Sequence, residues 1–169
     1  MFNGQYTIVP TRPTVYISGH ASVPFILFRL YAIWTVMAQL TQEMIDELNA
    51  TGIKSFATAS KDGTPNVVPV GFLFMGPDGN IWVIDNYFKK TLQNLKENPK
   101  AAFFVWTRDF KESYQIKGTV TIESSGADYE KAVKMAHDKN EIYPAKNLIK
   151  MKVEDIFYVT PGDHAGNKL

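Results

Sequence analysis

Residues 81–106, IWVIDNYFKKTLQNLKENPKAAFFVW, contain three elements in a row. Ile81–Asn86 is a short apolar run of the kind found in buried strands. Apolar residues at i, i+4 and i+7 then predict a helix over residues 88–98, which ends before Pro99. Ala101–Trp106 is a second apolar strand. The order strand, helix, strand therefore forms the centre of the expected fold.

The segments before this stretch predict a helix and a strand meander. Thr41 is a favourable N-cap for a short amphipathic helix that Gly52 ends. An Asp-Gly turn at residues 60–64 joins two strands, and a further turn leads into the strand at residue 81. The two strands are expected at Ile53–Ala59 and Pro65–Met75.

The segments after it predict two more strands and a helix. Tyr114–Glu123 alternates apolar and polar residues, as a half-buried strand does. A helical apolar stripe follows at residues 129–136, and Leu148–Val159 is the last expected strand. About six strands with inserted helices predict a mainly β (α+β) fold. A small closed barrel is expected because closure removes exposed strand edges.

Composition favours one globular domain with a small-molecule partner. Hydrophobic residues make up 45% of the 169 residues and charged residues 21%. The formal charge of +1 provides no strong field toward nucleic acid or anionic membranes, so we expect neither as a partner. The chain contains no cysteine, which removes disulfides and thiolate metal sites and fits the cytoplasmic location that we expect.

The first 36 residues differ from the rest. They contain no acidic residue, and their only basic residues are Arg12 and Arg29. The apolar run at residues 21–36 is interrupted and is shorter than the roughly 20 residues of a membrane-spanning helix. It also lacks the features of a signal peptide. We therefore expect residues 1–36 to be an extension outside the fold and residues 37–169 to form the domain, with a membrane anchor as the alternative.

Standard catalytic signatures are absent from the sequence. It contains no phosphate-binding Walker loop, dinucleotide glycine fingerprint, HExxH motif or nucleophile elbow. The three histidines, His20, His137 and His164, are scattered, so we expect no metal site and no catalytic triad. The sequence identifies no catalytic residue. If the protein is an enzyme, a cofactor is expected to carry the reaction.

The strongest local feature is the run Lys89, Lys90, Thr91 at the start of the central helix. Cations at a helix N-terminus oppose the helix dipole unless an anion is bound there. Free backbone N–H groups, a hydroxyl and two ammonium groups together favour a phosphate. The alternative interpretation is a pair of solvated lysines beside a strand end.

The segment Pro65–Met75 has two unusual properties. Pro69 and Gly71 interrupt it, so either a flat ring approaches the backbone there or the segment is an edge strand or bulge. Both of its faces are apolar, which predicts a subunit interface and hence a homodimer. Gln115 and Lys117 share the polar face of a later strand, for which a solvated face is the simplest interpretation.

Taken in order, these segments resemble the pyridoxamine-phosphate-oxidase-like, FMN-binding split barrels. The resemblance runs from about Leu40 to Val159 and is carried by residues 53–72 (IKSFATASKDGTPNVVPVGF), 81–106 and 114–123 (YQIKGTVTIE). It implies a six-stranded split β-barrel and a homodimer that holds FMN between its subunits.

The resemblance also implies the cofactor-binding residues. The basic pair Lys89 and Lys90 matches the family's phosphate ligands, and Thr91 and the backbone around Asp85 and Asn86 border the phosphate. The strand beside the isoalloxazine ring is matched by Val68, Pro69, Val70 and Gly71. The strand that carries Gln115 and Lys117 approaches from the partner subunit.

The C-terminus departs from the family pattern. True pyridoxamine-phosphate oxidases carry an Arg-Leu-x-Pro segment there, whereas this chain ends TPGDHAGNKL and has no arginine after Arg108. That specific activity is therefore not expected. The leading hypothesis is an FMN-dependent oxidoreductase that exchanges electrons or hydride with a nicotinamide or deazaflavin donor and a small-molecule substrate. The alternatives are a non-catalytic FMN carrier or storage protein and a haem-binding split barrel, which three histidines make less favoured.

Overall fold

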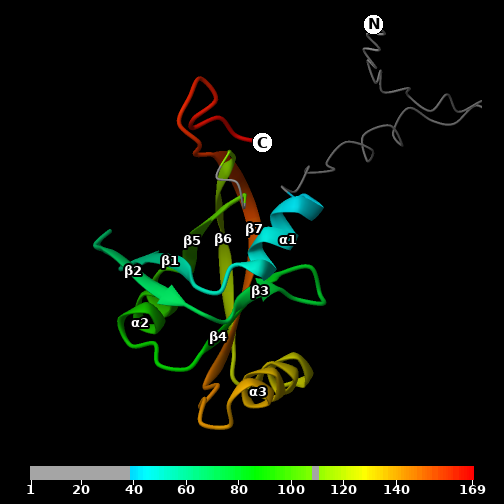
Figure 1. The fold of residues 1–169 in the computed structure, drawn as a ribbon. Helices are drawn as coiled ribbons and strands as arrows, with labels where there is room; N and C mark the ends of the chain where they lie inside the picture. The colour runs from blue at the N-terminus through cyan, green and yellow to red at the C-terminus, as the bar shows by residue number, and fades with distance from the viewer. Residues whose placement is uncertain (1–38, 108–110) are drawn as a thin grey trace, which may run out of the picture. The chain divides into compact units, whose positions relative to one another are not determined.

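The central stretch folds as strand, helix and strand. The computed structural model describes residues 39–107 and 111–169. In it, β4 (Ile81–Asp85) leads into α2 (Lys90–Glu97), and β5 (Lys100–Trp106) follows. These two strands are not neighbours in the sheet, because β6 and β7 lie between them. The helix therefore carries the chain across one end of the sheet (Figure 1).

All strand pairings are antiparallel, and the strands form one sheet in the order β2-β1-β5-β6-β7-β4-β3. This confirms the mainly β fold with inserted helices. The remaining elements are α1 (Gln42–Ala50), β1 (Lys54–Ala59), β2 (Pro65–Val70), β3 (Leu73–Met75), β6 (Ser113–Glu123), α3 (Ala127–Lys139) and β7 (Asn147–Tyr158).

The sheet has seven strands rather than about six, because the segment predicted as one strand, Pro65–Met75, is divided. Only Gly71 and Phe72 separate β2 from β3, yet these strands form opposite edges of the sheet. The sheet must therefore curl until its two edges approach each other. We call Gly71 and Phe72, where the chain passes from one edge to the other, the seam. There the backbone N–H of Ile84 donates to the carbonyl of Phe72 at 3.1 Å.

The main core fills the inside of the curled sheet. Thr41 caps α1 by accepting from the Met44 N–H at 3.2 Å, and Met44 and Leu48 of this helix are buried in the core. Along β6 the buried and less buried residues alternate as predicted. Gly118 marks a register shift between β6 and β7, where an added Cβ would lie 2.1 Å from the Lys152 carbonyl oxygen.

A second cluster lies between the sheet and α3. Trp82 and Ile84 of β4 pack there with Ala132 and Ala136 of α3. The indole N–H of Trp82 donates to Asp78 at 2.8 Å. Trp82 is fully buried.

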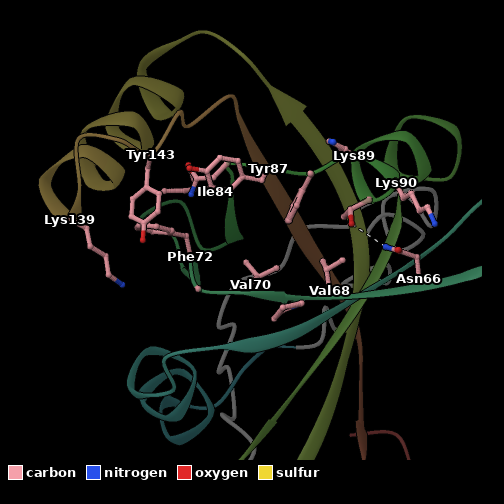
Figure 2. Close-up of a pocket in the computed structure, with 15 residues that line it drawn as sticks. Asn66, Val68, Val70, Phe72, Ile84, Tyr87, Lys89, Lys90, Lys139 and Tyr143 are labelled. Atoms are coloured by element: carbon pink, nitrogen blue, oxygen red, sulfur yellow. Dashed lines mark hydrogen bonds between the residues drawn. The ribbon is translucent and has the colours of Figure 1, made fainter.

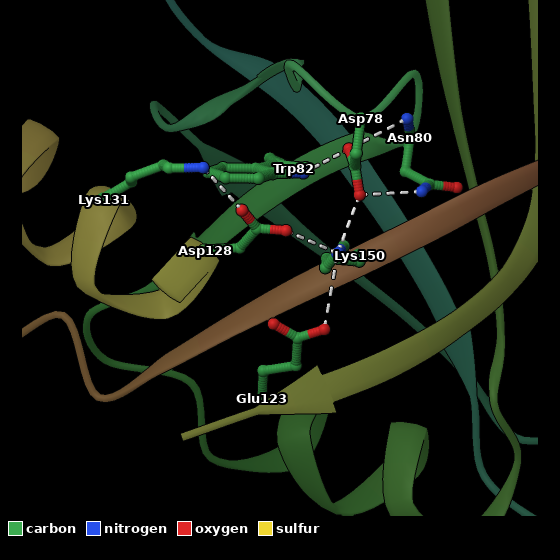
Figure 3. Close-up of polar contacts among 7 residues, drawn as sticks. All are labelled: Asp78, Asn80, Trp82, Glu123, Asp128, Lys131 and Lys150. Carbon is green, nitrogen blue, oxygen red and sulfur yellow. Dashed lines mark hydrogen bonds and ion pairs between the residues drawn. The ribbon is translucent and has the colours of Figure 1, made fainter. Parts of the chain in front are cut away.

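Lys150 of β7 connects three carboxylates near this second cluster (Figure 3). Its Nζ lies 2.7 Å from Asp78, 2.9 Å from Asp128 and 3.4 Å from Glu123. Burial alone would raise the pKa of Asp78, but hydrogen bonds from Lys150, Asn80 and Trp82 outweigh it and lower that pKa. Hydrogen bonds from Lys131 and then Lys150 lower the pKa of Asp128. The ion pairs thus tie α3 and the β3–β4 turn to β7.

Within residues 39–107 and 111–169, no helix is both long enough and apolar enough to cross a bilayer. The expected N-terminal extension, residues 1–36, and its boundary with the domain lie outside the described residues.

Candidate functional site

A pocket of about 570 Å³ opens beside β2, the seam, the β4–α2 loop and the end of α3 (Figure 2). Most of the residues predicted to bind the cofactor line it, namely Val68, Pro69, Val70, Gly71, Asn86, Lys89, Lys90 and Thr91. Its volume lies in the range of about 300–1,000 Å³ typical of small-molecule sites. The structure therefore brings two separate predicted segments, residues 68–71 and 86–91, to one cavity.

The N-terminus of α2 forms one end of the pocket. Lys89 is its N-cap but makes no side-chain capping bond, and the first turn contains no acidic residue. The first backbone N–H groups of a helix have no partner within it, so those of α2 remain available to an anion. Lys89 and Lys90 add two exposed ammonium groups at the same end. By contrast, α1 is capped by Thr41.

A network of side-chain amides and hydroxyls holds this end in place. Asn66 of β2 donates at 3.1 Å to Thr91 on α2 and at 3.1 Å to Thr58 on β1. Asn94 also donates to Thr58, at 3.2 Å. Thr91 is 2% exposed, and because its oxygen accepts from Asn66, its own proton is available to donate into the pocket. The hydroxyl is thus oriented before any ligand binds.

Asp85 has a different position from the other predicted residues. It is fully buried and does not line the pocket. Its carboxylate accepts from the Phe88 N–H at 2.7 Å and from the Asn147 amide at 2.8 Å, which fixes the β4–α2 loop. Asn86 does line the pocket and accepts from the Ala145 N–H at 3.0 Å.

The middle of the pocket is apolar. Val68 and Val70 share one face of β2 with Asn66, and the main chain at Pro69 and Gly71 completes this wall. β2 is an edge strand, as the proline predicts. Phe88 also lines the pocket and stacks against the buried Phe56, the β1 partner of Val68, with ring centroids 6.3 Å apart and planes 5° apart. These surfaces form an apolar slot that fits a flat ring.

The other end of the pocket, which we call the distal end, is formed by Phe72, Lys139 and Tyr143. The ring of Tyr143 meets that of Phe72 edge-on at a centroid distance of 5.3 Å. The Nζ atom of Lys139 lies 4.9 Å from the Phe72 ring centroid. Figure 2 places this end and the Lys89–Lys90 end on opposite sides of Val68 and Val70.

Gln115 and Lys117 are not brought to the pocket. Both lie on β6, where they pair with Phe104 and Ala102 of β5. The Lys117 ammonium lies 4.9 Å from the Phe157 ring centroid. Their approach to a cofactor from a partner subunit remains a prediction.

Several pocket residues were missed by sequence reasoning. Asn66 had a usable signal, because it alternates with Val68 and Val70 along one strand face. Lys139 and Tyr143 had none, because only the tertiary fold brings them to β2. Among the described residues no group of three or more His, Asp or Glu side chains has the arrangement of a metal site.

Comparisons with known proteins agree with this architecture. A family model described as pyridoxamine 5'-phosphate oxidase matches residues 40–160. An uncharacterized protein of Methanocaldococcus jannaschii is 32% identical over 133 residues, which cover 77% of this chain and 87% of that protein.

Two crystal structures extend the comparison. HupZ of Group A Streptococcus has a TM-score of 0.65 and 30% identity, covering 76% of this chain and all (100%) of the other. An FMN-binding protein of Syntrophomonas wolfei has a TM-score of 0.56 and 24% identity, covering 70% of this chain and 84% of the other. The seven-stranded curled sheet is therefore a split barrel of the expected kind.

Proposed function

This chain belongs to the pyridoxamine 5'-phosphate oxidase family, and from that premise we propose that it binds FMN in the pocket beside α2 and acts as an FMN-dependent oxidoreductase. The observation that carries the proposal is the uncapped, cationic N-terminus of α2 at one end of an apolar slot. A phosphate and a flat ring joined by a flexible chain match that combination.

The residues present fit each part of FMN. Lys89, Lys90, the free N–H groups of α2 and the Thr91 hydroxyl would hold the phosphate. The isoalloxazine ring would lie along Val68–Gly71, where the absence of a side chain at Gly71 leaves the backbone accessible. Asp85 would contribute indirectly, by holding the loop that carries Asn86 and Lys89.

When bound, FMN supplies the redox chemistry, by accepting and passing on electrons or hydride. The protein's own part is binding and orientation. The apolar slot excludes water from the ring, and the amide network keeps Thr91 and α2 in place. We propose a nicotinamide or deazaflavin donor and a small-molecule acceptor.

We also propose that the protein is a cytoplasmic homodimer. Val67 on the edge strand β2 is 62% exposed, although it is apolar. A shallow hollow on the sheet, lined in part by Ala57, Ala59 and Ala102, lies beside Lys117. A second copy of the chain that covers these surfaces would bury them and bring its Gln115 and Lys117 toward the flavin. The absence of cysteine supports the location.

Two measurements on the purified full-length protein test this function. The first is its absorption spectrum, and the second is the same spectrum after anaerobic mixing with NADH or NADPH. Flavin bands that bleach on mixing support a reductase. Flavin bands that persist with these donors and with a reduced deazaflavin favour the FMN carrier. A Soret band without flavin bands would replace FMN by haem and refute the proposal.

A further inference from the structure

Asn86 lines the pocket with a side-chain amide of which only the oxygen is used. That oxygen accepts from the Ala145 N–H at 3.0 Å. Because a backbone N–H can bond only to the oxygen of an amide group, this contact also fixes the direction of the amide nitrogen. Within residues 39–107 and 111–169 the amide nitrogen donates to no other group. Asn86 therefore holds two unused hydrogen-bond donors in a fixed orientation.

The unused donors face the pocket. Asn86 is only 9% exposed, yet no fully enclosed side-chain nitrogen or oxygen of the described residues lacks a hydrogen-bond partner. The amide nitrogen must therefore reach an opening, and the opening that Asn86 lines is the pocket. The alternation of side chains agrees, because Ile84 also lines the pocket whereas the Asp85 side chain is turned inward.

Asn66, the other asparagine that lines the pocket, has no such donor. Its amide nitrogen donates to Thr58 and to Thr91, at 3.1 Å each, so both of its hydrogens are used within the protein. An enclosed donor is favourable only when an acceptor lies opposite it. The protein supplies these acceptors for Asn66, whereas for Asn86 a ligand has to supply one.

The backbone that orients Asn86 is strained. Ala145 has a φ of 40°, in the left-handed region that a residue with a Cβ rarely adopts. Its N–H bond to Asn86 and the bond from the Lys146 N–H to the Asp85 carbonyl, at 2.8 Å, hold it there. The Asn147 amide adds a bond to the Asp85 carboxylate, also at 2.8 Å. Strain of this kind is typical of ligand-binding positions, which agrees with a ligand contact at Asn86.

The position of Asn86 favours a neutral acceptor over the phosphate. Its partner Ala145 lies two residues from Tyr143, which forms the distal end of the pocket. In the view of Figure 2, Tyr87, the residue after Asn86, lies between Tyr143 and Lys89. The phosphate end already has cations and helix N–H groups, whereas an uncharged amide suits a carbonyl oxygen.

We propose that the Asn86 amide donates to a carbonyl oxygen of the isoalloxazine ring and so fixes how the ring lies in the slot. This inference rests on the proposed function, since it assumes that FMN occupies the pocket. It assigns the Asn86 side chain to the ring, whereas the resemblance placed only the backbone around Asn86, beside the phosphate. A donor at a ring carbonyl also stabilises the negative charge that the ring gains on reduction. Loss of the donor should therefore lower the reduction potential of the bound flavin.

Infrared difference spectra of the full-length holoprotein test this contact. The protein is loaded with FMN that carries carbon-13 at one ring carbonyl at a time, because a hydrogen bond lowers the stretching frequency of the carbonyl that accepts it. The matched variant is Asn86→Asp at neutral pH, which keeps an oxygen for the Ala145 N–H but has no hydrogen to donate. One labelled band should lie at a lower frequency in the wild type than in this variant.

Titration of the apoprotein with riboflavin and lumiflavin gives a second readout. Both flavins are neutral and share the ring, and lumiflavin lacks the ribityl chain. A neutral hydrogen bond to the ring predicts that Asn86→Asp binds each of them roughly two- to tenfold more weakly than the wild type does.

Asn147→Ala is the matched control. Asn147 bonds to Asp85 in the same set of contacts, but it does not line the pocket. Its replacement should leave the carbonyl bands and both affinities unchanged. If Asn86→Asp does not fold, Asn86→Ala takes its place, and Asn147→Ala then separates loss of the donor from loosening of the segment after α3.

Three results would overturn the proposal. They are carbonyl bands that coincide in the wild type and the Asn86 variant, unchanged affinities for both flavins, and a loss of affinity for riboflavin alone, which would assign the donor to the ribityl chain. FMN that binds without any effect of Asn86 on the ring carbonyls leaves the proposed function intact. A wild-type protein that binds no flavin refutes the proposed function itself.

Discussion

Replacing Lys90 with alanine should weaken FMN binding and leave riboflavin binding almost unchanged. Riboflavin keeps the ring and the ribityl chain but lacks the phosphate that Lys90 is proposed to hold. A hydrogen bond to a charged group contributes about 1.5–3 kcal/mol, which corresponds to a roughly ten- to hundredfold loss of affinity. Because Lys90 is exposed, solvent screening places the loss near tenfold. The free N–H groups of α2 remain, so binding should not be abolished.

The same substitution should have the opposite effect on the apoprotein. A cation in the first helical turn opposes the helix dipole, so its removal should raise the free energy of unfolding by a few tenths of a kcal/mol. Lys96→Ala is the matched control, since Lys96 lies in the last turn of the same helix and is also exposed. It should slightly destabilise the apoprotein and leave the affinity for both flavins unchanged.

The assay is fluorescence titration of both flavins into the wild-type apoprotein and the two variants. Urea unfolding of the same samples gives their stability. The diagnostic result is that Lys90→Ala lowers FMN affinity while apoprotein stability holds or rises. If Lys90→Ala weakens FMN and riboflavin equally, the lysine supports the fold in general, and the phosphate assignment must be abandoned.

Three further predictions concern the fold and the assembly. Because the pKa of Asp78 is lowered in the folded state, the unfolded chain binds protons before the folded chain does as the pH falls below about 4, so the free energy of unfolding should decrease there. Lys150→Met removes a cause of that lowered pKa and should make the urea midpoints measured from pH 6 to pH 2 less dependent on pH. An unchanged dependence of the midpoint on pH would contradict this. Gly118→Ala should destabilise the fold by about 1–3 kcal/mol or more, because the new Cβ would collide with backbone, whereas Gly52→Ala, with open space around it, should have little effect on the same denaturation curves. Val67→Lys should convert the proposed homodimer to a folded monomer in sedimentation equilibrium; a dimer that persists would show that this face of β2 is not the interface.

The sequence predicted the elements well because their signals are local. The helical spacing that ends before Pro99 and the alternation along Tyr114–Glu123 both reflect burial of one face, and both elements are present. The division of Pro65–Met75 was missed: Gly71, which interrupts the apolar run, lies at the break between β2 and β3, but it was interpreted as a site of ring approach, an edge strand or a bulge. That division became visible only through the pairing of each half, with β1 and with β4.

The pocket was predicted only where it is built from contiguous residues. The run from Lys89 to Thr91 was found because its chemistry is unusual for a helix start. The resemblance placed the backbone around Asp85 near the phosphate, and the structure adds that the Asp85 side chain turns inward and fixes the loop. Lys139 and Tyr143 belong to another part of the chain, and nothing local to them indicates a ligand.

The seam at Gly71 and Phe72 determines when during folding the pocket can bind a cofactor. The β1–β2 and β3–β4 hairpins are adjacent in the chain, but they are connected through the sheet only by way of β5, β6 and β7. The pocket wall is therefore complete only once β7, the last of the described strands along the chain, has paired with β4. A nascent chain that ends before residue 147 contains the proposed phosphate-binding residues without the cavity around them. Uptake of the proposed flavin should thus complete folding rather than start it.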